Sequence, residues 1–172
     1  MQNNIFLIGF MGSGKSSIGV RLARKLKRTF VDTDREIEKV TGMTVAELFR
    51  RHGEVRFRSE EKLMLNKLTS RENLVIAAGG SLTPEADGRE IFGQNSIIIC
   101  LKAPPEEIFA RVNRKKGSRP LLKKAFTLED VEKLMEQHRG YEEIADFTVN
   151  TGGKPQEQIV DEIIDRLRLG QR

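Results

Sequence analysis

The segment that most constrains the fold lies near the amino terminus, where residues 9–16 read Gly-Phe-Met-Gly-Ser-Gly-Lys-Ser. They match the pattern G-x-x-x-x-G-K-S/T at every fixed position. Its glycines let the backbone curl so that successive N–H groups face a phosphate. An apolar run precedes the segment, and an amphipathic helix is expected over residues 15 to about 27. The segment therefore predicts a phosphate-binding loop (P-loop) between a strand and a helix.

The residue types of this loop carry specific chemistry. Lys15 is expected to reach the β- and γ-phosphates of a nucleotide, and the Ser16 hydroxyl to ligate Mg²⁺. GTPases, motor ATPases and small-molecule kinases all use such a loop. A length of 172 residues without an N-K-x-D stretch favours a small kinase. The predicted ATP-binding residues of the loop are Gly12, Ser13, Gly14, Lys15, Ser16 and Ser17.

Short apolar runs alternate with helical patterns along the rest of the chain. The candidate strands are residues 4–9, 29–32, 74–78, 96–101 and 147–150. Capping boxes are expected at Thr44-Val-Ala-Glu47 and Thr127-Leu-Glu-Asp130, and Pro155 suits the first turn of the last helix. Strands separated by helices imply a parallel sheet with helices on both faces, whose ligands bind beyond the carboxyl ends of the strands.

Charge and composition limit which other functional classes of protein remain open. A net charge of +5 and a pI near 9.5 invite a nucleic-acid reading, but acids and bases interleave except in the basic stretch 111–124. An RNA-binding P-loop module is the rival class. Against it, aromatic residues make up 6%, Trp is absent, and none interleaves with that stretch. The lone Cys100 is expected to be a buried strand thiol, and no apolar run approaches a membrane span, so a cytoplasmic setting is expected.

Two acids, Asp32 and Asp34, stand at the end of the second candidate strand. Residues two apart on a strand share a face, so both carboxylates are expected to point to the same side, next to the P-loop. A cation or hydrogen-bond donors must offset their repulsion, and Mg²⁺ plus a polyol would supply both. Asp32 is therefore assigned to the magnesium shell through water, and Asp34 to deprotonating the attacking hydroxyl. The alternative is that both acids merely cap the following helix.

Further acceptor candidates lie around the third candidate strand. The turn Gly79-Gly80-Ser81 follows it, and glycines there allow a ligand to approach the backbone closely. Arg58 offers a guanidinium fork suited to a carboxylate, although an arginine alone is more often a helix-surface residue.

Together these residues resemble the shikimate kinase family, and the resemblance covers nearly the whole chain. It implies a three-layer αβα P-loop kinase with a five-stranded parallel sheet in the order 2-3-1-4-5. It also implies the reaction of ATP with shikimate to give ADP and shikimate 3-phosphate. The matching pieces are residues 9–16, the Asp32-Thr33-Asp34 pair of acids, Phe57-Arg58 with Glu61, Gly79-Gly80, Arg119-Pro-Leu-Leu and Tyr141-Glu-Glu-Ile-Ala-Asp.

The resemblance also implies roles for individual residues. Arg119 would come from a mobile lid, about residues 113–126, onto the transferring phosphate. Arg111 and Pro155 would lie near the adenine and, with Arg119, complete the ATP site. The catalytic set is Lys15, Asp34 and Arg119, and the shikimate-binding set is Asp34, Arg58, Gly79, Gly80 and Arg139. We expect one domain over residues 1–172, with substrate-binding helices at about 33–62, acting as a monomer on ATP and shikimate without nucleic acid or membrane.

Two positions depart from the family pattern. Ser81 stands where the family has a third glycine, and it adds a Cβ and a hydroxyl near the acceptor. Gln137 replaces the arginine expected four residues before Tyr141, while Arg139 stands two residues before it. Either the helix ends near Gly140 and Arg139 bends back into the site, or Arg58 holds the carboxylate with less help. The third possibility is another acceptor, such as gluconate, on the same architecture.

Overall fold

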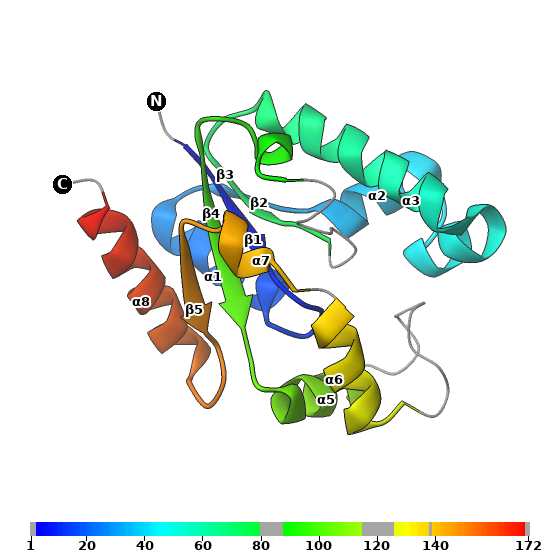
Figure 1. Ribbon diagram of the computed structural model, residues 1–172. Helices are drawn as coiled ribbons and strands as arrows, with labels where there is room; N and C mark the ends of the chain where they lie inside the picture. Colours follow the sequence, from blue (N-terminus) through cyan, green and yellow to red (C-terminus); the bar gives the residue numbers. More distant parts are fainter. Residues whose placement is uncertain (1–2, 80–87, 115–125, 138, 171–172) are drawn as a thin grey trace.

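The computed structural model describes residues 3–79, 88–114, 126–137 and 139–170 (Figure 1). Gly80, Ser81, Arg119 and nearly all of the expected lid lie outside the described residues. Among the described helices, none combines the length and apolar character that crossing a membrane requires.

Five parallel strands form one sheet in the order β2-β3-β1-β4-β5, which confirms the expected topology. Two predicted strands are one residue too long, because the chain turns into loops at Gly9 and Ala78. The fourth strand continues to Lys102, which pairs with Asn150. The strands are β1 (Asn4–Ile8), β2 (Thr29–Asp32), β3 (Leu74–Ala77), β4 (Ser96–Lys102) and β5 (Phe147–Asn150).

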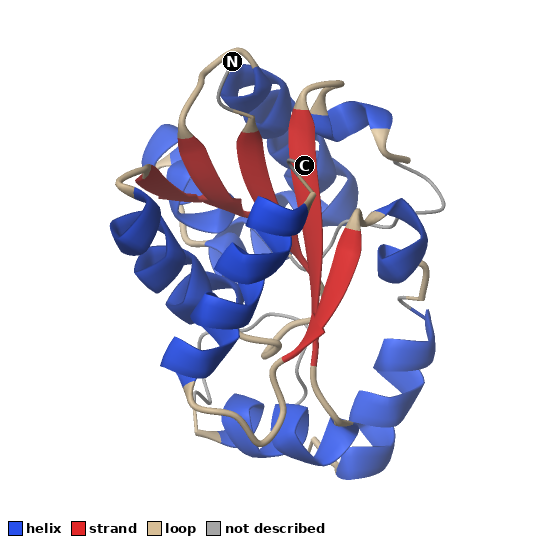
Figure 2. Ribbon diagram, turned by 90° about the vertical axis from the view of Figure 1, so that its left-hand side faces the viewer, coloured by secondary structure: helices blue, strands red, loops and turns tan. Residues whose placement is uncertain are grey.

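Helices cover both faces of this sheet, and Figure 2 shows the strands twisting between them. On one face, Ile5 and Leu7 pack against α1 (Lys15–Leu26) and α8 (Gln156–Leu169). On the other, Phe6 and Ile8 pack against α2 (Thr33–Thr41) and α3 (Val45–Thr69). The alternation along β1 thus builds a three-layer core. The remaining helices are η1 (Glu90–Phe92), α5 (Pro105–Asn113), α6 (Leu128–Gln137) and α7 (Tyr141–Ile144).

Local capping sets where the helices begin. Thr44 and Glu47 form the predicted reciprocal box before α3, and Thr127 and Asp130 exchange the same pair of bonds before α6. Pro155 stands directly before α8. A non-helical residue, Gly53, divides α3 into two parts, and Arg58 lies on the second.

Candidate functional site

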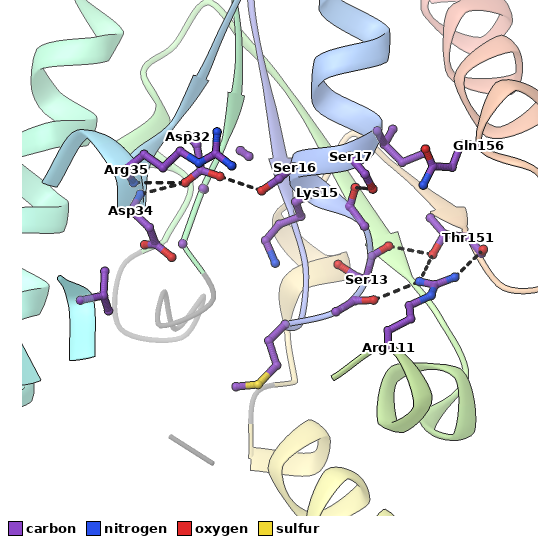
Figure 3. A pocket seen from close by; sticks show the side chains of 18 of the residues that line it. Ser13, Lys15, Ser16, Ser17, Asp32, Asp34, Arg35, Arg111, Thr151 and Gln156 are labelled. Carbon is purple, nitrogen blue, oxygen red and sulfur yellow. Dashed lines mark hydrogen bonds between the residues drawn. The ribbon is translucent and has the colours of Figure 1, made fainter. Parts of the chain in front are cut away.

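A cavity of about 640 Å³ opens where the carboxyl ends of β1, β2 and β3 meet (Figure 3). This is the edge at which open parallel sheets bind their ligands. The lining combines the P-loop with Asp32, Asp34 and Gly79, so the nucleotide candidates and part of the acceptor candidates face one space. Arg35, Glu38, Val45, Phe49, Phe57 and Arg114 also line it, as do Arg111, Thr151, Lys154 and Gln156.

The P-loop has the backbone that its sequence predicts. Gly14 adopts φ 106°, a left-handed conformation that favours glycine, and directly precedes the first residue of α1, Lys15. The amino end of α1, with its positive dipole end, therefore faces the cavity. The Lys15 ammonium donates to the carbonyls of Gly9 at 2.6 Å and Phe10 at 3.0 Å, so it is held over the loop.

Ser16 and Asp32 meet beside the P-loop. The Ser16 hydroxyl donates to Asp32 Oδ2 at 2.6 Å (Figure 3). The Ser16 oxygen keeps its lone pairs, and hydroxyl and carboxylate oxygens are donors that Mg²⁺ accepts. Within the described residues, no cluster of three or more His, Cys, Asp or Glu side chains could hold a metal alone. The pair therefore fits Mg²⁺ whose other ligands are phosphate and water, which is how this ion is commonly bound.

Asp34 reaches the cavity by a different route from the one expected. The strand ends at Asp32, and Asp34 lies in the first turn of α2, so the two acids do not share a strand face. The Asp32 side chain caps this helix: its Oδ1 accepts from the backbone N–H groups of Asp34 at 3.1 Å and Arg35 at 3.4 Å. Asp32 therefore caps α2, as the alternative predicted, and also accepts from Ser16, so capping is not its sole contact.

Gly79 lies directly against two carboxylates. A Cβ built on it would come within 2.2 Å of Glu61 Oε1 and 2.8 Å of Asp34 Oδ1. Real Cβ atoms do not approach so closely, so only glycine fits without moving one of these side chains. Glu61, on α3, is only 1% exposed. This packing brings α3 and the turn after β3 together at the acceptor end of the cavity.

Arg111 braces the P-loop. Its guanidinium donates to Gly12 O at 3.0 Å, to Thr151 O at 3.0 Å and to Glu107 at 2.9 Å. Figure 3 shows Arg111 beside Thr151. The fork thus joins α5 to the P-loop and to the segment after β5. Gln156, at the start of α8, lines the same end of the cavity and accepts from Arg21 at 2.6 Å.

The two arginines expected to hold a substrate carboxylate lie apart from this cavity. Among the described residues, Arg58 and Arg139 are outside its lining. Arg58 pairs with Glu54 at 2.9 Å, and its side chain is 32% exposed. The helix before Tyr141 does end early, at Gln137, but Arg139 pairs with Glu136 and is 73% exposed. Arg139 instead lines a second cavity, of about 720 Å³, beside Tyr141.

The single cysteine has no chemistry of its own here. Cys100 is 2% exposed in β4, as expected, and burial raises the pKa of its thiol to about 11. A thiol with this pKa is neutral near pH 7 and therefore a weak nucleophile.

Sequence patterns missed two buried threonines at this edge of the sheet. Thr33 and Thr151 are 0% and 2% exposed, and their hydroxyls bond to the loops that line the cavity. The signal for both was their place just after a strand, at the edge where ligands bind.

Comparisons with known proteins agree on one family. The shikimate kinase family model matches residues 11–168. A shikimate kinase from Pelotomaculum thermopropionicum is 47% identical over 167 residues, 97% of this chain and 96% of that protein. A solved shikimate kinase from Acinetobacter baumannii, in complex with shikimate, is 38% identical with a TM-score of 0.86, covering 100% of this chain and 96% of that one.

A kinase of the alternative acceptor, gluconate, is less similar to this chain. A gluconokinase from Sinorhizobium meliloti is 16% identical with a TM-score of 0.62, covering 99% of this chain and 98% of that one. This likeness reflects the shared fold alone. The family model, the relative that is 47% identical and the expected sheet order all agree. The chain therefore belongs to the shikimate kinase family.

Proposed function

We propose that this protein transfers the γ-phosphoryl group of ATP to the 3-hydroxyl of shikimate, giving ADP and shikimate 3-phosphate. The observation that carries the proposal is a cavity that the P-loop shares with Asp34 and Gly79, in a chain of this family. In the reaction, the bond between the 3-oxygen and the γ-phosphorus forms. The bond from that phosphorus to the β–γ bridging oxygen breaks, and the hydroxyl proton leaves.

The nucleotide half of the site positions phosphates. Lys15 leaves its carbonyl partners, Gly9 and Phe10, for the β- and γ-phosphate oxygens, which compete for the same ammonium donors. The N–H groups of the loop and the start of α1 face these oxygens. Because phosphoryl transfer involves little covalent chemistry by the protein, such positioning and charge carry most of its contribution.

Ser16 and Asp32 are the residues that would hold Mg²⁺. The Ser16 oxygen would ligate the ion directly, its hydroxyl still donating a hydrogen bond to Asp32, and Asp32 would act through water. The ion, when bound, neutralises charge on the β- and γ-phosphate oxygens.

Asp34 is the proposed base. It stands at the start of α2 beside Gly79, on the side of the cavity away from Arg111 and Gln156. From there it accepts a hydrogen bond from the acceptor hydroxyl and takes its proton as the new bond forms. Gly79 leaves room for the carboxylates of Asp34 and Glu61 beside the acceptor, and the proposed substrate-binding role extends to Gly80, which lies outside the described residues.

The acceptor carboxylate needs cations that must move. Arg58 and Arg139 are proposed to bind it; Arg58 is partly buried and pairs with Glu54, and Arg139 pairs with Glu136 in an exposed ion pair. An exposed pair contributes little stability, so a substrate carboxylate can displace Glu136 from Arg139. Arg119 is proposed to close onto the γ-phosphate. Arg111 and Pro155 are proposed to flank the adenine, and the monomer is the proposed working unit.

The first experiment measures ADP release by the purified protein with MgATP, with and without shikimate, and with gluconate in parallel. Shikimate-dependent turnover that disappears in Lys15→Ala is expected. Lys25→Ala is the matched control, because Lys25 lies on the same helix but pairs with Asp161 on α8, away from the cavity. Turnover that depends on gluconate, or ATP binding without any shikimate dependence, would contradict the proposed acceptor.

A further inference from the structure

Two buried threonine hydroxyls hold the loops that form the two halves of the cavity. Thr33 is the first residue of α2, next to β2, and Thr151 directly follows β5. We infer that both are positioning residues: Thr33 holds the loop of the acceptor half in place, and Thr151 holds the loop of the nucleotide half. The inference rests on the proposed function, since it assigns each hydroxyl to one of its two substrates.

Thr33 ties the start of α2 to the turn after β3. Its hydroxyl accepts from Gly79 N at 2.9 Å and donates to Ala77 O at 3.3 Å, and both contacts are buried. Ala77 and Gly79 line the cavity, whereas Thr33 lies behind them, 0% exposed. Because Gly79 packs against Asp34 and Glu61, this hydroxyl fixes the distance between the glycine turn and the proposed base.

Thr151 ties the segment after β5 to the P-loop. Its hydroxyl donates to Ser13 O at 2.8 Å, with Lys102 O as a second carbonyl within reach at 3.1 Å. It also accepts from Arg111 at 3.2 Å, and the same guanidinium holds Gly12 O. One hydroxyl therefore positions both the peptide that turns toward the phosphates and the arginine that braces it.

The two networks have no residue in common. Thr33 bonds to the turn after β3, while Thr151 bonds to the P-loop, α5 and the end of β4. Removing one hydroxyl leaves a buried N–H or C=O without its partner, and the loop that carries this group shifts to find another. A displacement of this kind weakens binding of the substrate that the loop contacts. Binding of the other substrate is unchanged, because its loop stays in place.

The test replaces each hydroxyl by a methyl group of the same shape. In Thr33→Val, the KM for shikimate is expected to rise about tenfold, as the loss of one buried hydrogen bond implies, with the KM for ATP unchanged. In Thr151→Val, the KM for ATP is expected to rise by a similar factor, with the KM for shikimate unchanged. Each variant is the matched control of the other. Thr41→Val removes a hydroxyl that bonds to Ile37 O at the far end of α2, and both constants should stay at their wild-type values.

Serine variants test the same hydroxyls even if the valine variants fail to fold. Thr33→Ser and Thr151→Ser keep the hydrogen bonds and lose only a methyl group, so both Michaelis constants should match the wild type. The inference would be overturned if Thr33→Ser raised the KM for shikimate, or Thr151→Ser the KM for ATP, by as much as the factor expected for the valine variants. Valine variants that change both constants equally or neither would also overturn it. The wild-type protein distinguishes failure of the inference from failure of the proposed function. If the wild type shows no shikimate-dependent turnover, the proposed function is wrong, and the affinity for ATP measured by calorimetry still tests the role of Thr151.

Discussion

The nucleotide half and the acceptor half of the cavity are built in different ways. The nucleotide half consists largely of backbone from one continuous segment, residues 9–17, locked by Arg111 and Thr151. The acceptor half consists of groups from separate elements: Asp34 on α2, the turn at Gly79, and Glu61 on α3, which packs against that turn. The arginines proposed for the acceptor carboxylate, Arg58 and Arg139, lie outside the cavity lining and pair with Glu54 and Glu136.

This difference indicates which half is preformed. A helix amino terminus and a curled glycine loop present their donors before any ligand arrives, because secondary structure fixes them. The proposed role of Arg58 and Arg139 instead requires the side chains that pair with Glu54 and Glu136 to turn toward a carboxylate. In the proposed reaction the backbone of the nucleotide half therefore stays in place and only the Lys15 side chain moves, whereas binding of the acceptor moves side chains on α3 and after α6.

The variant expected to separate the two halves most clearly, with the largest effect, is Asp34→Asn. The amide keeps the size of the side chain but cannot take the acceptor proton, so kcat should fall by about 10²- to 10⁴-fold. ATP affinity, measured by calorimetry, should not change, because the P-loop does not involve this residue. Asp165→Asn, an exposed acid on α8, serves as the control. A loss of activity smaller than tenfold would show that Asp34 is not the base.

The opposite half is tested through magnesium with Asp32→Asn. Asparagine caps a helix as well as aspartate does, so α2 keeps its start while Ser16 loses its charged partner. Outer-shell changes of this kind lower metal affinity by about 10- to 100-fold. The Mg²⁺ concentration for half-maximal rate should rise by that factor, with activity recovering at high Mg²⁺ and the KM for shikimate at its wild-type value. A defect that excess Mg²⁺ does not relieve would contradict the assignment.

Sequence predicted the backbone of the P-loop and the sheet well because this information is local. The glycine spacing of residues 9–16 predicts the loop, and five short apolar runs separated by helical patterns predict the parallel sheet and its three layers. Cys100 was correctly expected to be buried, since the run 96–100 reads as a strand enclosed on both faces.

The acceptor half was harder to predict because tertiary contacts decide it. Asp34 was assigned to a strand face, yet Asp32 ends the strand by capping α2. No spacing rule places Glu61 against Gly79, since α3 and the turn after β3 meet only in the folded chain. Arg139 shows the same limit: a helix end near Gly140 was one of the alternatives, but the ion pair of Arg139 with Glu136 was not predicted.

The smallest expected effect lies at the start of α3, which carries acceptor residues but begins far from the P-loop in sequence. The carboxylate of Glu47 accepts from the backbone N–H and the hydroxyl of Thr44, and mainly the former lowers its pKa below the ordinary 4.5. A lowered folded-state pKa means that the charged form stabilises the fold. This contribution is present above the ordinary pKa and is lost as the pH falls through the folded value.

Glu47→Gln should therefore lower the free energy of unfolding slightly at neutral pH, because glutamine keeps the capping geometry and loses only the charge. Urea unfolding of variant and wild type from pH 7 downward should show the difference shrinking once the pH passes below 4.5 and vanishing when the wild-type carboxylate is protonated. Glu72→Gln, in the exposed turn before β3, is the control. Both Michaelis constants should keep their wild-type values. A difference that grew toward acid pH would mean that the carboxylate destabilises the helix start, and the sign of the argument would be reversed.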